Sequence, residues 1–348
     1  MTSTAPTSPG GVAGLHPAYF ALVMATGIVS VACHLHGWTT VARALFYLNL
    51  GFYPALWLLT LARVVRHRGR VAADFLHHGR SVGFFTTVAA TCVLGSQCLL
   101  VGDSFRAASA LWFAGIALWA VLTYAIFTII TVKPDKPALA DGIHGGWLVA
   151  VVAAQSVAVL GAQLAPGFGE GAPHALVFSL AMWLGGGMLY LWIISLIFYR
   201  YTFFPMSPSD LAPPYWINMG AAAISTLAGT MLVAAAPHSP VLEQVLPFVR
   251  GFTVFWWATA TWWIPMLVIL GVWRHGFRRF PLRYDPLYWG AVFPLGMYTV
   301  CTLRIATAVD APFLAGIARA FIYVAVGAWA LAAGGMVVTL LRRAPAAR

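Results

Sequence analysis

A short stretch near the C-terminal end combines an aromatic ring, a proline and a positive charge within an apolar segment. Phe293 directly precedes Pro294, and Arg304 follows eleven residues after Phe293. In a helix this spacing puts Phe293 and Arg304 on one stripe, about 20° apart around the axis and roughly 16 Å apart along it. Pro294 predicts a helix kink, because it removes a backbone hydrogen bond. A charge in an apolar segment is a functional candidate; simple packing for Phe293 and an arginine that reaches the membrane surface are the alternatives.

The sequence offers few side chains for attaching a cofactor or binding a metal ion. Lys133 and Lys136 are the only lysines and lie in a polar stretch, so a retinal Schiff base within an apolar segment is excluded. His34 and His36 lack further ligands nearby, which favours interfacial polarity over metal binding. The cysteines have no C-x-x-C spacing and indicate packing residues: Cys33, Cys92, Cys98 and Cys301. We expect no cofactor, no metal site and no catalysis, with a membrane-embedded cofactor enzyme as a remote alternative.

Composition decides the class of protein that carries these residues. The 348 residues are 61% apolar and only 8% charged, whereas a soluble domain has about 25% charged residues. So little charge cannot cover a soluble surface of this size. The sequence therefore predicts an all-α polytopic membrane protein.

Ten apolar stretches are long enough to cross a bilayer, which takes about 20 residues. Residues 1–16 predict a flexible cytoplasmic N-terminal tail, residues 17–341 the transmembrane domain, and residues 342–348 a short basic cytoplasmic tail. The ten predicted spans are 17–36, 41–62, 82–101, 107–132, 144–165, 174–199, 214–236, 250–273, 286–308 and 312–341.

The basic residues predict an orientation. Fifteen of the twenty Lys and Arg residues fall on one side of the alternating spans, which the positive-inside rule makes cytoplasmic together with both termini. The other side keeps Arg43, Arg106, Arg250, Arg304 and Arg319. The excess of basic residues is explained by membrane topology and by contacts with anionic lipid head groups. We therefore expect no nucleic acid as a partner.

Spacing predicts five helical hairpins. The odd-numbered spans begin near residues 17, 82, 144, 214 and 286, at intervals of roughly 62–72 residues. Eleven of the fifteen Trp residues lie in even spans, while odd spans carry more uncharged polar residues. One interpretation has aromatic residues facing lipid around a polar interior path; close helix packing through small residues is the alternative.

Polar residues that share one face of a predicted helix are the candidates for lining a polar interior path. Thr26 and Ser30 are four residues apart and so lie on one face, and Thr87 and Thr91 repeat that spacing. The candidate pore-lining residues are Thr26, Ser30, Thr87, Thr91, Gln155, Asn218, Ser225 and Val300. Neutral hydroxyl and amide groups suit an anion that must enter and also leave.

Four segments resemble a known family. They are FALVMATGIVS at 20–30, GGWLVAVVAAQSVAVLG at 145–161, PPYWINMGAAAIS at 213–225 and WGAVFPLGMYTVCT at 289–302. The sequence resembles the tellurite-resistance/dicarboxylate transporters, which include the plant slow anion channels, over all ten spans. The resemblance implies five hairpins around a quasi-fivefold central pore, with odd helices inside, and a homotrimer with one pore in each protomer.

The resemblance also implies the role of Phe293, since a phenylalanine directly before the ninth-helix proline gates the pore in that family. One departure is that only Pro294 lies mid-span in an odd helix, so we expect Gly27, Gly95 and Gly229 to supply bends elsewhere.

The leading functional hypothesis is an anion channel or transporter of the plasma membrane. Arg304, Arg43, Arg250 and Arg319 are the candidates for attracting anions. The substrate stays open among tellurite, sulfite, chloride, nitrate and malate-like dicarboxylates. A proton-coupled dicarboxylate carrier is the alternative, although no acidic residue lies mid-span to relay a proton.

Overall fold

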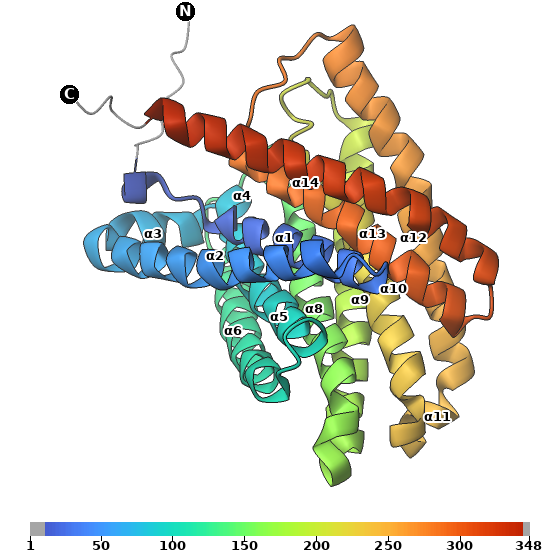
Figure 1. The fold of residues 1–348 in the computed structure, drawn as a ribbon. Coiled ribbons are helices and arrows are strands. Elements are labelled where there is room, and N and C mark those ends of the chain that lie inside the picture. The colour runs from blue at the N-terminus through green and yellow to red at the C-terminus, as the bar shows by residue number, and fades with distance from the viewer. Residues whose placement is uncertain (1–10, 344–348) are drawn as a thin grey trace, which may run out of the picture.

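The computed structural model describes residues 11–343, which form helices joined by short turns, with no strand in that range (Figure 1). Helices satisfy their own backbone hydrogen bonds, as a chain this apolar requires inside a bilayer. Within the described range, nine continuous helical stretches are long and apolar enough to cross a membrane. One of them, Gly145–Phe203, has 59 residues and is broken at Gly169, whose φ of 56° is non-helical. The ten membrane crossings and the fivefold axis stay predictions.

Ten helices of fifteen residues or more alternate between an inner and an outer position. The inner ones are α1 (Ala21–Leu35), α5 (Phe85–Leu100), α8 (Val149–Leu164), α10 (Ile217–Ala235) and α13 (Trp289–Ala308). The outer ones are α2 (Thr39–Arg66), α6 (Phe105–Val132), α9 (Ala172–Phe203), α12 (Leu246–Val272) and α14 (Ala315–Arg343). Short helices fill the connections: α3 (Arg68–Leu76), α4 (His78–Ser81), α7 (Leu139–Gly142) and α11 (Pro240–Gln244).

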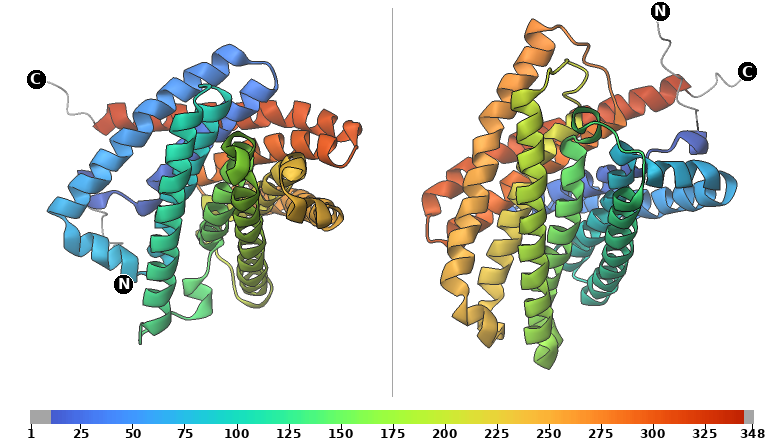
Figure 2. Two further views of the ribbon diagram at one scale, coloured as in Figure 1. Left: turned by 90° about the horizontal axis from the view of Figure 1, so that it is seen from below. Right: turned by 180° about the vertical axis from the view of Figure 1, so that it is seen from behind.

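Burial separates the two sets. In the helical stretches that contain the inner helices, 67–94% of the residues of the most apolar part are buried inside the protein. The corresponding share is only 11–22% in the stretches that contain the outer helices α2, α6, α12 and α14. The inner helices contact one another in chain order, and α13 contacts α1, so they form a closed ring. Seen from below, the hairpins follow one another around the molecule from blue through green to red (Figure 2). The ring therefore has an axis on which a pathway can lie.

Outer-helix tryptophans connect the two layers. Trp112, Trp183 and Trp256 are buried, so the expectation that these aromatic residues face lipid is wrong for them. The Trp183 indole N–H donates to the Ser225 carbonyl over 2.8 Å, and that of Trp112 donates to the Val157 carbonyl over 3.0 Å. An indole N–H needs an acceptor in an apolar environment, and the inner helices supply one to Trp112 and to Trp183.

Turns of 3-10 helix lead into all five inner helices, at Pro17–Phe20, Val82–Phe84, Gly145–Leu148, Pro213–Trp216 and Pro286–Tyr288. Three of them share a pattern that sequence analysis overlooked: HPAYF at 16–20, APPYW at 212–216 and DPLYW at 285–289. Proline is favoured at the first position of a helical turn, where no N–H is needed. Part of the predicted N-terminal tail takes part, since the His16 ring accepts the Ala18 N–H; residues 1–10 and 344–348 lie outside the described residues.

Glycines let the inner helices approach closely. A Cβ at Gly27 would collide with Val93 of α5, and one at Gly95 would collide with Leu160 of α8. Gly220 of α10 leaves room for Pro294 of α13, because a Cβ there would lie 2.6 Å from the Pro294 ring. These glycines, like Gly229 against Thr253, lie inside helices that continue through them and serve close packing.

We expect Gly27→Ala to destabilise the protein, because the added methyl group overpacks the α1–α5 contact. Overpacking of this kind costs about 1–3 kcal/mol. The matched control is Gly51→Ala on α2, where nothing lies within 4 Å of the added Cβ. Thermal unfolding in detergent should show a lower Tm for Gly27→Ala and an equal or slightly higher Tm for Gly51→Ala. Equal Tm values would contradict the packing role of Gly27.

Candidate anion pathway

A narrow cavity lies where the five inner helices meet. Its volume is about 20 Å³, counted as the space in which the centre of a water molecule fits. Every inner helix contributes to its lining: Ile28, Val31, Leu35, Cys92, Val93, Ser96, Leu100, Ser156, Val159, Gln163, Ile224, Leu227, Met297, Val300 and Arg304. No Asp or Glu occurs among these lining residues. The cavity is therefore mostly apolar, with a few neutral polar groups and one positive charge.

Helix α13 presents one stripe of side chains along this cavity. Met297, Val300 and Arg304 line it, and Phe293 is four residues before Met297, which places it one turn earlier and within about 40° of the same direction. Phe293 is 1% exposed. The ring is thus buried at the end of the stripe opposite Arg304. Helix α13 continues across Pro294, and the kink stays a prediction.

The four predicted anion-attracting arginines occupy different surroundings. Arg304 is half-buried in the cavity lining, and its guanidinium makes no hydrogen bond or ion pair with any residue of the described range. Arg43, Arg250 and Arg319 are exposed and lie outside the lining. Arg250 borders a separate surface depression that also contains Asp310. Of the four arginines, Arg304 is the one placed to meet an ion in the cavity.

Most of the predicted hydroxyl and amide candidates contact outer helices instead of the cavity. Thr26 accepts the indole N–H of Trp329 over 3.0 Å, and Ser30 donates to the carbonyl of Ala42 over 2.7 Å. Thr91 shares a 2.8 Å hydrogen bond with Tyr53 of α2.

The remaining candidates have comparable partners. Gln155 donates to the Trp183 carbonyl over 3.0 Å, and Asn218 donates to the Tyr201 hydroxyl over 3.2 Å. Thr87 and Ser225 donate to carbonyls of their own chain segment, those of Phe84 and Ala221. None of these seven residues is in the cavity lining, whereas Val300 is.

The other polar groups that line the cavity, besides Arg304, were not among the predicted pore-lining residues. They are Ser96 on α5 and Ser156 and Gln163 on α8. Ser96 donates to the Gln163 amide oxygen over 2.7 Å. Their helical spacing carries a signal, since Ser156 and Gln163 are seven residues apart and so share one face.

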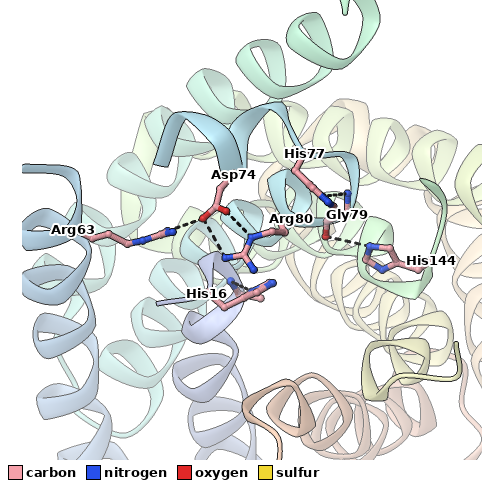
Figure 3. Close-up of polar contacts among 8 residues, drawn as sticks. His16, Arg63, Asp74, His77, Gly79, Arg80 and His144 are labelled. Carbon is pink, nitrogen blue, oxygen red and sulfur yellow. Dashed lines mark hydrogen bonds and ion pairs between the residues drawn. The ribbon is translucent and has the colours of Figure 1, made fainter. Parts of the chain in front are cut away.

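A buried ion cluster lies beside the starts of the inner helices, as Figure 3 shows. Asp74 of α3 bonds to Arg63 at the end of α2 over 2.7 Å and to Arg80 of α4 over 2.5 Å. Arg63 and Asp74 are both buried. The cluster fastens the α3–α4 segment to the first hairpin, a contact that the sequence did not reveal.

Histidines complete this end of the molecule. His144 Nδ1 accepts the Gly146 N–H over 3.0 Å, so its Nε2 donates to the Gly79 carbonyl at 3.2 Å (Figure 3). Burial, with the nearby Arg80 guanidinium, lowers the pKa of His16 to about 4. The His16 ring is therefore neutral at neutral pH and keeps Nδ1 free to accept the Ala18 N–H. Residues 11–343 contain no group of three or more His, Cys, Asp or Glu side chains that could hold a metal ion.

Comparison with protein families decides which family this architecture represents. Residues 14–337 match the family model of the voltage-dependent anion channel. The chain belongs to this family. The family is named for an anion channel, and two of the relatives described below are named a transporter and an efflux pump, which accords with anion transport across a membrane.

Relatives of this voltage-dependent anion channel family member come from an archaeon, a bacterium and a fungus. It is 28% identical over 290 residues to an uncharacterized transporter of Methanocaldococcus jannaschii, covering 81% of each chain. It is 40% identical over 143 residues to an uncharacterized membrane protein of Mycobacterium tuberculosis, covering 41% of this chain and 72% of the relative. It is 22% identical over 344 residues to the sulfite efflux pump SSU1 of Trichophyton rubrum, covering 92% of this chain and 89% of the relative.

Proposed function

We propose that this chain conducts small inorganic anions along the axis of the inner ring and that the Phe293 ring closes the path. The observation that carries the proposal is the α13 stripe. Met297, Val300 and Arg304 line one cavity shared by all five inner helices, and the helix period continues that line to the buried Phe293. A hydrophobic constriction next to a cationic vestibule can block or pass an anion according to the position of one ring.

Sulfite, chloride, nitrate and tellurite are the substrate candidates that fit this proposal best. A similarity to the sulfite efflux pump SSU1 spans most of both chains and supports sulfite as one candidate. A malate-like dicarboxylate fits less well, because its second carboxylate would need a second cation and the lining offers only Arg304. The lining also offers no Asp, Glu or His to couple transport to protons.

The proposal includes a plasma-membrane location with both termini cytoplasmic. Contacts between segments support the charge asymmetry on which this rests, since Lys133 bonds to the Leu76 carbonyl and Arg200 to the Ala140 carbonyl at the same end as the Asp74 cluster. A homotrimer with one path in each protomer belongs to the proposal through the family resemblance.

Reconstitution into proteoliposomes tests the proposed function. We expect an imposed chloride, nitrate or sulfite gradient to produce an anion-selective current or swelling, with much weaker responses to malate and to potassium. The cause is the single positive charge and narrow width of the cavity. Protein-free vesicles and vesicles with heat-denatured protein are the controls. Cation-selective conduction would contradict the proposal.

A further inference from the structure

We propose that Gln163 and Arg304 coordinate one small inorganic anion, a halide or a compact oxyanion, at the end of the axial cavity away from Phe293. This inference rests on the proposed function and adds the residues that select the ion. Both side chains line the cavity, Gln163 from α8 and Arg304 from α13.

Hydrogen bonding makes the amide nitrogen the free donor of the Gln163 side chain, which lines the cavity. Its oxygen accepts the Ser96 hydroxyl over 2.7 Å, which leaves the amide nitrogen to find another partner. The contact recorded for that nitrogen is the Met231 sulfur at 3.9 Å, and a thioether is a weak acceptor. Gln163 therefore has N–H groups available that a stronger acceptor, such as an anion, would satisfy.

Arg304 supplies the charge. Its guanidinium is half-buried and meets no carboxylate or other hydrogen-bond acceptor within the described part of the chain. A charge that is partly withdrawn from water and has no counter-charge is less stable than a fully hydrated one, so an anion in the cavity would stabilise it. Arg43 and Arg319 are exposed, so water stabilises their charges and they do not require a bound anion.

The size and chemistry of the cavity set the class of ion. About 20 Å³ is open to water centres, which suits one small ion that has lost part of its hydration. The neighbouring side chains at this end, Leu35 on α1 and Leu100 on α5, are apolar. One charge and one amide bind an ion less tightly than several charges would, so the ion can also leave.

Transport kinetics of Gln163 variants test the site. In the Phe293→Ala background, we expect Gln163→Leu to raise the half-saturating nitrate concentration about tenfold, as loss of a hydrogen bond to a charged group implies. Gln163→Glu should raise it further, because it places a negative charge against the ion. Gln244→Leu makes the same change at an exposed position of α11 and should leave the value unchanged. Conduction with an unchanged half-saturating concentration in Gln163→Leu would overturn the site.

Bromide binding separates this site from the proposed function. In crystals soaked in bromide, we expect an anomalous peak between Gln163 and Arg304 that disappears in Gln163→Leu and persists in Gln244→Leu. If no variant conducts any anion, the proposed function fails, and this peak alone supports the site. Absence of the peak in protein that conducts anions overturns the site and leaves the function standing.

Discussion

Phe293→Ala is expected to raise anion flux at least tenfold in proteoliposomes. The ring is buried at the end of the α13 stripe that lines the axial cavity, and its removal opens the constriction to water and ions. A tenfold rise corresponds to a barrier lower by about 1.4 kcal/mol, less than the cost of dehydrating an ion at a hydrophobic plug. Nitrate flux followed by a potential-sensitive dye measures the change.

Two further variants distinguish gating from general loosening of the protein. Phe85→Ala also removes a fully buried ring from an inner helix, but Phe85 packs against Phe127 of α6 and is absent from the cavity lining. We expect it to lower stability without raising flux. Phe293→Trp keeps a large ring in place and should stay closed. If Phe85→Ala and Phe293→Ala raise flux equally, Phe293 is not the gate.

The helical fold and the division into two kinds of helix could be predicted from the sequence, because both depend on local composition. Stretches of about 20 apolar residues define the spans, and the concentration of tryptophan in alternate spans separates outer from inner helices. The structure confirms the all-helical membrane fold. The stripe shared by Val300 and Arg304 could also be predicted, since it follows from the period of one helix.

The residues that line the axis could not be predicted in the same way. Periodicity shows that Thr26 and Ser30 share a face, but it does not show the direction in which that face points. In the structure, Ile28 and Val31 of the same helix line the cavity, while Thr26 and Ser30 bond to outer helices. A polar residue in an apolar protein needs a hydrogen-bond partner, and an outer-helix tryptophan or carbonyl serves as well as a permeating ion.

The Asp74 cluster was not predictable for a different reason. Arg63, Asp74 and Arg80 lie in a charged stretch between two spans that has the composition of a solvated loop. They meet because α3 and α4 fold back over the first hairpin, and the composition of the stretch does not encode that fold. The resulting burial turns an apparently ordinary loop acid into a structural residue.

Asp74→Asn is therefore expected to cause a large loss of stability. A neutral amide in place of the carboxylate would leave the Arg63 and Arg80 guanidinium groups without a counter-charge, and Arg63 is 4% exposed. Removing one partner of a buried ion pair costs about 3–5 kcal/mol. We expect a Tm well below that of wild type in detergent, whereas Asp135→Asn, at an exposed loop position, should change it little.

Replacing Arg63 together with Asp74 tests whether the unpaired Arg63 charge causes the loss of stability. Because the loss in Asp74→Asn comes from leaving Arg63 charged and buried, replacing Arg63 as well should recover part of it. We expect the double variant Arg63→Met/Asp74→Asn to be more stable than Asp74→Asn alone, with non-additive effects in a double-mutant cycle. Arg80→Gln should cost less than Arg63→Gln, because the Arg80 side chain is 34% exposed and the Arg63 side chain 5%. Additive effects of Arg63→Met and Asp74→Asn would contradict a direct ionic coupling between them.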